Sequence, residues 1–443
     1  MIDFGRSDDP RVTAQLDRMA KLSVPQGRLG LQTIRALMER LGNPHRKLPP
    51  VFHVAGTNGK GSVCAFLRAM LEADGNRVHV TTSPHLVRYN ERIRLAGKLI
   101  DDEPLAELLK EVLDASEQGG EDLAPSFFEV TIAAAFLAFS RSPADACVVE
   151  VGVGGRLDAT NVLEPEALAA CGIAALGIDH EQFLLAPEEG VPTEPMARIA
   201  FEKAGIAKKG VPLVTMGSAY SIAERAAIRE VSERRKALLQ EMGEGWDCSP
   251  TDNNFYYRDE SQADGPWWLP QPQMPGIHQL TNAGLAIAML RSQRDIGVSY
   301  ADIKEGLGSA SWPARMQKLS DGLLTSLAPE HTIWLDGGHN LSAGEAIARL
   351  FEERQLHLIL GMLDNKNPRA LLNPLGEKVR TLQVVPVPGH DSHPASAFGE
   401  DAIARDDLED ALLNVPSDGS PILIAGSLYL AGEALRLNDE IPD

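Results

Sequence analysis

The sequence predicts an α/β protein in which a three-layer first domain is followed by a second, smaller α/β domain. Short apolar runs alternate with longer amphipathic segments for most of the 443 residues, which is the pattern of βα units around a parallel sheet. A polar stretch with aromatic clusters interrupts the alternation at residues 253–270, and a second series of apolar runs follows residue 296. Because a chain of this length exceeds the usual size of one hydrophobic core, two domains are expected.

The first series supplies the elements of the first domain. Short apolar runs predict buried strands at residues 51–54, 78–81, 146–151, 170–178 and 211–215. Amphipathic segments predict helices at residues 30–41, 62–74, 103–115, 130–140, 194–207, 221–242 and 278–292. Strands and helices that alternate in this way predict a sheet covered by helices on both faces.

The interrupting stretch at residues 253–270, NNFYYRDESQADGPWWLP, breaks the α/β rhythm. Aromatic residues are typical of strands, so we interpret it as a small antiparallel insertion. A plain surface hairpin is the simpler alternative.

The second series predicts the smaller domain. Its strand-like runs are residues 332–335, 357–360, 381–385 and 422–425, each followed by a helix-like or glycine-containing segment. We place the boundary within residues 297–313, which gives domains of 1–297 and 298–443. Clefts between two such domains are favoured ligand sites.

Composition and charge exclude several classes of protein. The formal net charge of −20 and the lack of a dense Lys/Arg run argue against binding to nucleic acid or to an anionic membrane. No apolar run approaches the roughly 20 residues that span a bilayer, and residues 1–10 lack the features of a signal peptide, so a cytoplasmic protein is expected. The four cysteines are far apart and form no CxxC pair, so neither a disulfide framework nor a thiolate zinc site is indicated.

Residues 51–67, VFHVAGTNGKGSVCAFL, are a strand, a glycine-rich turn and the start of a helix. Glycines let backbone N–H groups converge on an anion, the helix N-terminus adds a favourable dipole, and Lys60 adds a charge. The loop departs from the strict Walker pattern, because Val54 stands where glycine is usual and Gly61 separates Lys60 from Ser62. The segment predicts a nucleotide phosphate site; a glycine turn with a solvated lysine is the alternative.

Three residues near strand ends, Ser83, Glu150 and His180, are candidate metal ligands. Ser83 follows one strand, and Glu150 ends another, where an unpaired buried carboxylate would be costly; an ion-paired core glutamate is the alternative. On spacing alone, His180 is better explained as a residue that caps a turn. Lys203 lies on an amphipathic helix beside Glu202, and a surface ion pair would explain both.

Ten segments together resemble one family, the folylpolyglutamate synthase and dihydrofolate synthase enzymes of the Mur ligase superfamily. They occur in the family's order, from near residue 24 to about residue 430: GRLGLQTIRALMERLGNP, HVAGTNGKGSV, TSPHLVRYNERIRLAG, SFFEVTIAAAF, EVGVGGRLDATNV, IDHEQF, IAFEKAGI, HQLTNAGLA, WPARMQ and LDGGHN. Each segment is moderately specific, and the ordered set is very specific.

The resemblance implies a P-loop, Mur-ligase-like ATPase domain with the pterin site at 1–297 and a Rossmann-like glutamate-ligase domain at 298–443. It implies an ATP-dependent amide ligase that adds L-glutamate to dihydropteroate and to reduced folates. ATP would phosphorylate a carboxylate, and the amine of glutamate would attack the acyl phosphate. Phosphoryl transfer between anions requires cations, so ATP as co-substrate and two magnesium ions are expected.

The resemblance also assigns roles to residues, and it reverses the simpler explanations of His180 and Lys203. The expected ATP contacts are Thr57, Asn58, Gly59, Lys60, Gly61, Ser62, Asn282, Arg315 and Asp336. The expected metal ligands are Ser83, Glu150, His180 and Lys203, the last as a carbamate. The expected pterin contacts are Arg28, Leu29, Gly30, Ser126, Phe128, Glu129, Leu157, Asp158 and Ala159. Lys60, Lys203 and His339 are the expected catalytic residues, and closure of the two domains is expected to exclude water.

Some features depart from the family. The connection EQFLLAPEEGVPTEPMAR after His180 is longer than usual, WPARMQ replaces Pro-Gly-Arg-Phe but keeps the arginine, and Leu341 stands where proline is usual. The first departure concerns the loop geometry around the second metal.

The sequence leaves alternatives open. They are a monofunctional folylpolyglutamate synthase, a muramyl-peptide ligase, and a nucleotide-binding regulatory protein without catalysis. The expected partners are small-molecule substrates alone, and the expected state is a monomer.

Overall fold

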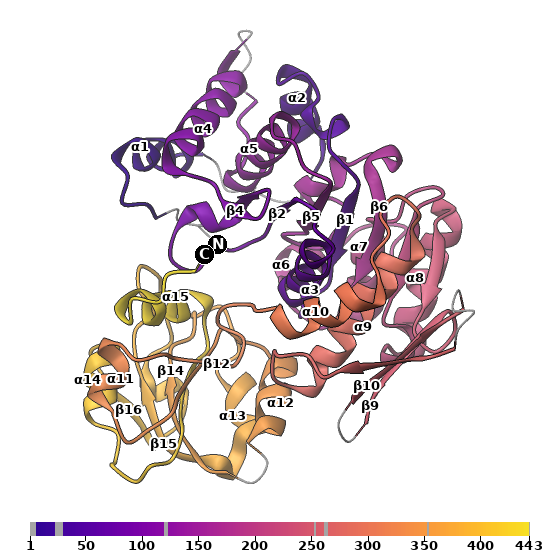
Figure 1. Cartoon of the computed structure of the whole chain (residues 1–443). Helices are drawn as coiled ribbons and strands as arrows, with labels where there is room; N and C mark the ends of the chain where they lie inside the picture. Colours follow the sequence, from indigo (N-terminus) through magenta and orange to yellow (C-terminus); the bar gives the residue numbers. More distant parts are fainter. Residues whose placement is uncertain are drawn as a thin grey trace. The chain divides into compact units, whose positions relative to one another are not determined.

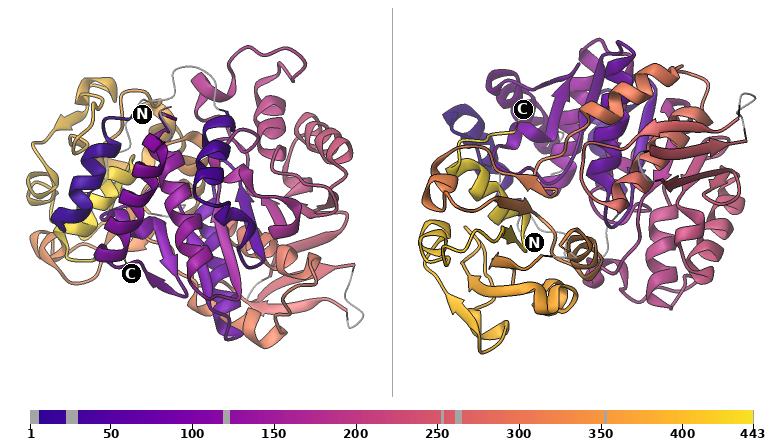
Figure 2. Two further views of the ribbon diagram at one scale, coloured as in Figure 1. Left: turned by 90° about the horizontal axis from the view of Figure 1, so that it is seen from above. Right: turned by 60° about the horizontal axis from the view of Figure 1, so that its bottom comes forward.

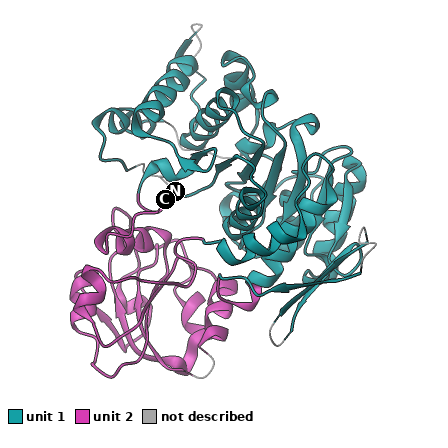
Figure 3. Ribbon diagram, viewed as in Figure 1, with its two compact units in different colours: residues 1–84, 88–273, 279–311 teal, residues 85–87, 274–278, 312–443 magenta. Residues whose placement is uncertain are grey.

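The computed structural model describes residues 6–22, 30–118, 123–251, 254–260, 265–351 and 354–442 (Figure 1). The chain forms two compact units (Figure 3). Unit 1 comprises residues 1–84, 88–273 and 279–311, and unit 2 comprises residues 85–87, 274–278 and 312–443. The division into an ATP-binding domain at 1–297 and a glutamate-ligase domain at 298–443 stays a prediction.

Unit 1 is built on an eight-stranded sheet of order β4-β3-β2-β5-β1-β6-β7-β8. The strands are β1 (Val51–Ala55), β2 (Val78–Thr81), β3 (Ile93–Leu95), β4 (Lys98–Leu99), β5 (Ala146–Glu150), β6 (Leu168–Ile173), β7 (Pro212–Thr215) and β8 (Leu238–Glu241). All neighbours pair in parallel except at the β3 and β4 edge, where pairing is antiparallel. The fully buried strand β1 lies near the middle, so its carboxyl end is enclosed by its neighbours.

Helices flank this sheet on both faces (Figure 2). They are α1 (Pro10–Met19), α2 (Gln32–Arg40), α3 (Lys60–Ala73), α4 (Asp102–Glu117), α5 (Phe127–Arg141), α6 (Glu181–Leu184), α7 (Pro195–Ala204), α8 (Ile222–Arg235), α9 (Ile277–Ser292) and α10 (Tyr300–Ser309). Helix α10 packs against α3, and a Cβ at Gly306 would lie 2.6 Å from the backbone of Met70. Residue 306 therefore has to lack a side chain for the two helices to approach this closely.

The structure confirms most of the predicted elements of unit 1 and corrects two. The helix predicted at 221–242 is too long: α8 ends at Arg235, Lys236 takes a left-handed conformation, and residues 238–241 form β8. The apolar residues that extended the periodicity belong to an edge strand paired with β7. The strand predicted at 170–178 spans only Leu168–Ile173 in β6.

The predicted antiparallel insertion is confirmed. Strands β9 (Trp246–Pro250), β10 (Asn254–Asp259) and β11 (Trp267–Pro270) form a separate antiparallel sheet of order β11-β10-β9. Strand β9 precedes the predicted range, and residues 252–253 and 261–264 lie outside the described residues.

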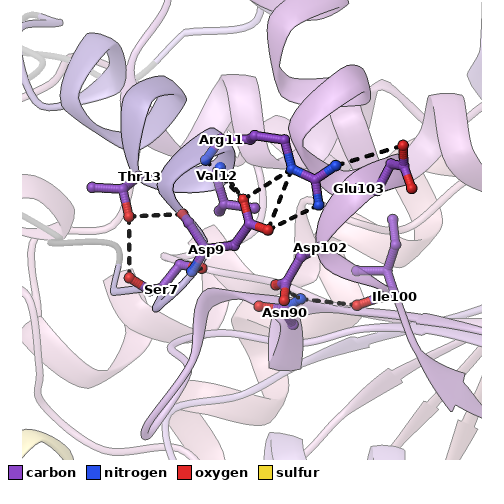
Figure 4. Close-up of polar contacts among 9 residues, drawn as sticks. All are labelled: Ser7, Asp9, Arg11, Val12, Thr13, Asn90, Ile100, Asp102 and Glu103. Atoms are coloured by element: carbon purple, nitrogen blue, oxygen red, sulfur yellow. Dashed lines mark hydrogen bonds and ion pairs between the residues drawn. The ribbon is translucent and has the colours of Figure 1, made fainter.

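Helix α1, which periodicity did not predict, is held to α4 by polar contacts (Figure 4). Asp9 caps α1 by accepting hydrogen bonds from the backbone N–H groups of Arg11 (2.7 Å) and Val12 (3.3 Å). Arg11 in turn lies 3.5 Å from Glu103 of α4. The side chain of Asn90 donates to Asp102, the first residue of α4, at 2.9 Å. The Arg11–Glu103 pair thus joins the start of α1 to the start of α4, while Asp9 and Asn90 each bond the start of one of the two helices.

Unit 2 has a six-stranded sheet of order β12-β13-β17-β14-β15-β16. The strands are β12 (Gln317–Lys318), β13 (Ile333–Asp336), β14 (Leu356–Leu360), β15 (Val379–Val384), β16 (Ala402–Ala404) and β17 (Ile422–Ala425), all parallel except β12. Its helices are α11 (Leu323–Leu327), α12 (Leu341–Leu350), α13 (Arg369–Leu375), α14 (Leu408–Leu413) and α15 (Leu428–Leu437). The four strands predicted for the smaller domain are thereby confirmed. None of the helices in the described part of the chain is long and apolar enough to cross a membrane.

Candidate active site

The glycine-lysine loop leaves the carboxyl end of β1 and enters α3, as the sequence predicts. Thr57 anchors it: its N–H donates to the carbonyl of Ala175 at 2.8 Å, and its hydroxyl donates to the carbonyl of Gly177 at 2.8 Å. Gly59 has φ 82° and precedes the first helical residue, Lys60. The loop therefore presents a helix N-terminus, with its unpaired N–H groups, at the carboxyl edge of the sheet.

Asn282 of α9 lies directly against this loop. A Cβ at Gly59 would be 2.5 Å from Asn282 Oδ1, so the amide packs where any other residue at 59 would carry its side chain. Gln279 accepts a hydrogen bond from Asn282 Nδ2 at 2.9 Å and orients the amide. The structure thus brings together two candidates that are more than two hundred residues apart in the sequence.

Lys60 begins α3, and its ammonium donates to the carbonyl of Thr57 at 3.3 Å. The side chain thus folds back over the loop. Gly61 and Ser62 follow in the first helical turn and are buried. A cation over converging N–H groups is suited to a polyphosphate.

Ser83 and Glu150 meet at the ends of neighbouring strands β2 and β5. The N–H of Ser83 donates to Glu150 Oε2 at 3.1 Å, and Glu150 is 5% exposed. This contact places the carboxylate of Glu150 beside Ser83, and a serine hydroxyl and a carboxylate are hard oxygen ligands of the kind that magnesium prefers.

Lys203 of α7 is buried, with 3% of its surface exposed, and its Nζ donates to the carbonyl of Gly56 at 2.9 Å. Burial, together with the charge of Lys60, lowers the pKa of Lys203 to about 7. The surface ion pair that periodicity allowed is therefore wrong. The amine lies behind the phosphate loop and is partly unprotonated near neutral pH.

His180 takes a left-handed conformation just before α6, and its N–H donates to Asp179 Oδ1 at 2.8 Å. Its Nε2 lies 3.9 Å from Asp179 Oδ2. The segment that carries it is tied to the phosphate loop through the contact between Gly177 and Thr57. Its imidazole is partly exposed.

A partly buried network of four charged side chains supports the helix of Lys203. Arg156 lies 2.9 Å from Glu202 and 2.6 Å from Glu188, and Arg198 lies 2.9 Å from Glu202 and 3.0 Å from Glu188. Glu188 belongs to the long connection that departs from the family pattern, so this connection contributes a carboxylate that joins the 151–158 loop to α7. Sequence reasoning missed the network, although the i, i+4 pairing of Arg198 with Glu202 is a readable signal.

The predicted pterin contacts fall into two groups in unit 1. Ser126 and Glu129 form a capping box at the start of α5: Ser126 N–H and hydroxyl both donate to Glu129 Oε2 at 2.8 Å. The ring of Phe128 covers Gly152, where a Cβ would lie 2.5 Å from the ring. The start of α5 and the 151–159 loop are therefore adjacent.

Asp158 and Ala159 are buried in that loop, and Leu157 is partly exposed. Asp158 Oδ2 accepts from Val153 N–H at 2.8 Å, and Oδ1 accepts from Thr160 N–H at 3.0 Å. Burial raises the pKa of Asp158 despite these bonds. Asp158 therefore holds the backbone of the 151–159 loop through hydrogen bonds from inside the loop. Arg28 and Leu29 lie outside the described residues, and Gly30 precedes α2.

The candidates of unit 2 gather at the carboxyl end of β13. Asp336 accepts from Met316 N–H at 2.9 Å and from Gly338 N–H at 2.7 Å. Arg315 lies against Gly337, and His339 Nδ1 donates to the carbonyl of Gly337 at 3.2 Å. His278, which was not singled out, is close enough to Asp336 and Arg315 for their charges to act on it, and burial lowers its pKa.

The mostly parallel sheet and the lysine-bearing loop at the end of its strand β1 define a P-loop nucleotide-binding protein. No protein-family model matches the chain. A relative from Bacillus subtilis (strain 168), dihydrofolate synthase/folylpolyglutamate synthase, is 31% identical over 442 residues, which cover 91% of this chain and 94% of the relative. The chain belongs to the folylpolyglutamate synthase/dihydrofolate synthase family.

Solved structures agree with this assignment. The structure of Escherichia coli FolC in complex with DHPP and ADP superposes with a TM-score of 0.82 at 28% identity, and it covers 98% of both chains. A bifunctional folylpolyglutamate synthase/dihydrofolate synthase with Mn, AMPPNP and L-glutamate bound gives a TM-score of 0.81 at 28% identity, over 98% of this chain and 99% of that one. These likenesses confirm the predicted α/β fold with a large first sheet and a smaller second one.

Proposed function

We propose that the protein is an ATP-dependent ligase that joins L-glutamate to dihydropteroate and to reduced folates through an acyl phosphate. The observation that supports it most is the arrangement at the end of β1: a phosphate loop with Lys60 above it, Asn282 against it and Lys203 behind it. The identity with the Bacillus subtilis enzyme extends over nearly the whole chain.

The chemistry accounts for the cations. A carboxylate is a poor electrophile until it is phosphorylated, and negative charge builds up on the transferred phosphoryl group. We assign the phosphates to the loop residues Thr57, Asn58, Gly59, Lys60, Gly61 and Ser62, with Asn282, Arg315 and Asp336 as further ATP contacts. His339 is a proposed catalytic residue close to Asp336.

Ser83, Glu150 and His180 are the proposed magnesium ligands. The contact between Ser83 N–H and Glu150 fits this role because it orients the carboxylate at the edge of the sheet where the loop lies. Magnesium would neutralise charge on the phosphates, and two ions are proposed.

Lys203 is proposed to react with carbon dioxide. Only the unprotonated amine can do so: a nitrogen–carbon bond forms, a proton leaves to solvent, and an anionic carbamate results. The lowered pKa of Lys203 supplies the unprotonated amine near neutral pH. The carbamate oxygens would then serve as metal ligands in place of a buried cation.

The pterin is proposed to lie by the start of α5 and the 151–159 loop. The aromatic face of Phe128 suits a stacked ring, and Glu129 has a second carboxylate oxygen beyond the one in its capping box. Arg28, Leu29, Gly30, Ser126, Leu157, Asp158 and Ala159 complete the proposed set. We also propose that the protein acts in the cytoplasm as a monomer and that its partners are small molecules.

The test is glutamate-dependent release of ADP by the purified chain. Release with both dihydropteroate and tetrahydrofolate is expected. Release with tetrahydrofolate alone indicates a monofunctional folylpolyglutamate synthase, and release only with a muramyl peptide indicates the other ligase class. No release with any acceptor leaves a nucleotide-binding regulatory protein and refutes the ligase. As a control, Lys60→Ala should lower the rate by about 10² or more, because it removes an electrostatic contact to the phosphates.

A further inference from the structure

Unit 2 carries a cluster of two histidines and an aspartate at the amino edge of its sheet. His331 lies just before β13, His357 is the second residue of β14, and Asp418 lies in the segment before β17. Strand β17 lies between β13 and β14, and all three are parallel, so their starts meet at one edge. Asp336 ends β13, so the cluster is at the opposite edge from the proposed ATP contacts of this unit.

The three side chains lie close enough together to hold a metal ion. Each offers one ligand atom, and these atoms lie within 4.8 Å of one another. His357 Nε2 is 3.1 Å from Asp418 Oδ1. Ligand atoms around a tetrahedral zinc ion, with bonds of about 2.0–2.1 Å, are about 3.3 Å apart. That pair therefore already has nearly the separation that zinc requires.

Each of the three side chains also has a hydrogen-bond partner outside the cluster. His331 Nδ1 lies 2.6 Å from the carbonyl of Ser420. A carbonyl only accepts, so Nδ1 carries the hydrogen, and Nε2 of the neutral ring keeps its lone pair. Asp418 Oδ2 accepts from Arg380 at 2.7 Å, and His357 Nδ1 lies 2.8 Å from the hydroxyl of Thr381. Contacts of this kind orient metal ligands.

The hydroxyl of Thr381 allows His357 to change its role. Without an ion, Nε2 of His357 faces a carboxylate, which only accepts, so Nε2 donates, and in the neutral ring Nδ1 then accepts from Thr381. A hydroxyl donates or accepts by rotation. With an ion, the neutral ring carries its hydrogen on Nδ1 and donates it to Thr381. The lone pair of Nε2 is then free, and no net proton is gained or lost by the ring.

We propose that His331, His357 and Asp418 form a zinc site, with water as the fourth ligand. Two imidazole nitrogens and a carboxylate oxygen suit zinc, whereas magnesium prefers oxygen ligands. His357 is buried, but Asp418 is exposed, so the ion has access from solvent. Bound there, it joins the segments that precede β13, β14 and β17. The proposed magnesium ligands all belong to unit 1, so the two sites share no residue.

The test is zinc content after equilibrium dialysis of the full chain in zinc-buffered solution without nucleotide or magnesium. Because the proposed magnesium ligands of unit 1 can also take zinc, the readout is a difference between variants. His331→Gln and Asp418→Asn should each hold one zinc ion per chain fewer than the wild type. His393→Gln is the matched control: it removes a histidine of the same unit that bonds the carbonyl of Lys366 outside the cluster, and it should keep that ion.

Two further measurements separate a zinc site from a structural role of the same side chains. Thr381→Val should weaken zinc binding 10–100-fold, as expected for loss of an outer contact. Zinc should raise the midpoint of thermal unfolding of His393→Gln by more than that of His331→Gln. His331 is only partly buried, so His331→Gln should fold normally by circular dichroism. If a folded His331→Gln binds as many zinc ions as the wild type, the proposal is overturned.

Discussion

Glu202 and Lys203 are consecutive residues of one helix, but their side chains have different kinds of partner. Both are buried, with 4% and 3% of their surfaces exposed. Glu202 lies within 2.9 Å of two arginines, Arg156 and Arg198, whereas the hydrogen-bond partner of Lys203 among the described residues is one backbone carbonyl. Isolated buried charges are costly, and paired ones are tolerated.

The difference teaches how a reactive amine can be kept in a protein interior. The two arginines bind the carboxylate of Glu202, so this carboxylate does not pair with the ammonium of Lys203. The pKa of Lys203 therefore falls to about 7 by burial, while Glu202 holds the helix in place through its ion pairs. One residue stabilises the helix, and its neighbour is left for chemistry.

Lys203→Met gives the largest expected effect. Activity should fall by about 10²–10³-fold, because methionine cannot form the carbamate that is proposed as a metal ligand. At neutral pH in metal-free buffer the midpoint of thermal unfolding should rise, since a buried ammonium is replaced by an apolar chain of similar length. Lys208→Met is the matched control, because Lys208 also donates to a single backbone carbonyl, that of Asn161, and should leave activity near normal. Loss of stability together with loss of activity would contradict the comparison.

Glu202→Gln should lower the free energy of unfolding, because it changes the residue of the two that is ion-paired. Removal of one partner leaves the guanidinium groups of Arg156 and Arg198 short of a charge, and breaking a buried pair in this way costs about 3–5 kcal/mol. Chemical denaturation measures the loss. The control is Glu181→Gln on the exposed surface of α6, which should change little. An unchanged denaturation midpoint for Glu202→Gln would show that the network adds nothing to folding.

The pH dependence of stability should differ between wild type and Lys203→Met. The pKa of Lys203 is about 7 in the folded chain and near 10.5 when unfolded, so the unfolded state binds more protons between these values. Stability should therefore rise with pH from about 7 to about 10, by up to about 1.4 kcal/mol per unit from this group. Other groups contribute equally to both proteins. Parallel curves of unfolding free energy against pH for the two proteins would contradict the lowered pKa of Lys203.

The smallest effect concerns a pair at the surface rather than in the interior. Hydrogen bonding to Arg11 lowers the pKa of Asp9 to about 2. Because the folded value is below the unfolded one, the contribution of Asp9 is complete above about pH 4 and is lost as the pH falls towards 2. Asp9→Ala should speed hydrogen exchange in α1 without changing activity, and Asp17→Ala on the exposed face of α1 should not. Equal exchange in both would exclude Asp9 as an effective cap.

The sequence predicted the strands and the phosphate loop because both depend on local patterns. Apolar runs and a glycine-lysine turn are visible in a few consecutive residues. The burial of Lys203 without a carboxylate partner is not visible in this way, because it depends on Arg156, which comes from another segment and pairs with Glu202. The end of α8 was missed for a similar reason: whether residues 238–241 continue a helix or form a strand is decided by the open edge of β7. His331 and His357 come together only through the order of the strands in unit 2.

The hydroxyl of Thr57 both donates to the carbonyl of Gly177 and accepts from its N–H. Two stretches of chain that are 120 positions apart are therefore joined through one side chain. Tolerance at this position follows hydrogen-bonding capacity rather than size: serine, although smaller, can keep both hydroxyl bonds, while valine, which matches threonine in shape, leaves only the backbone bonds to Ala175.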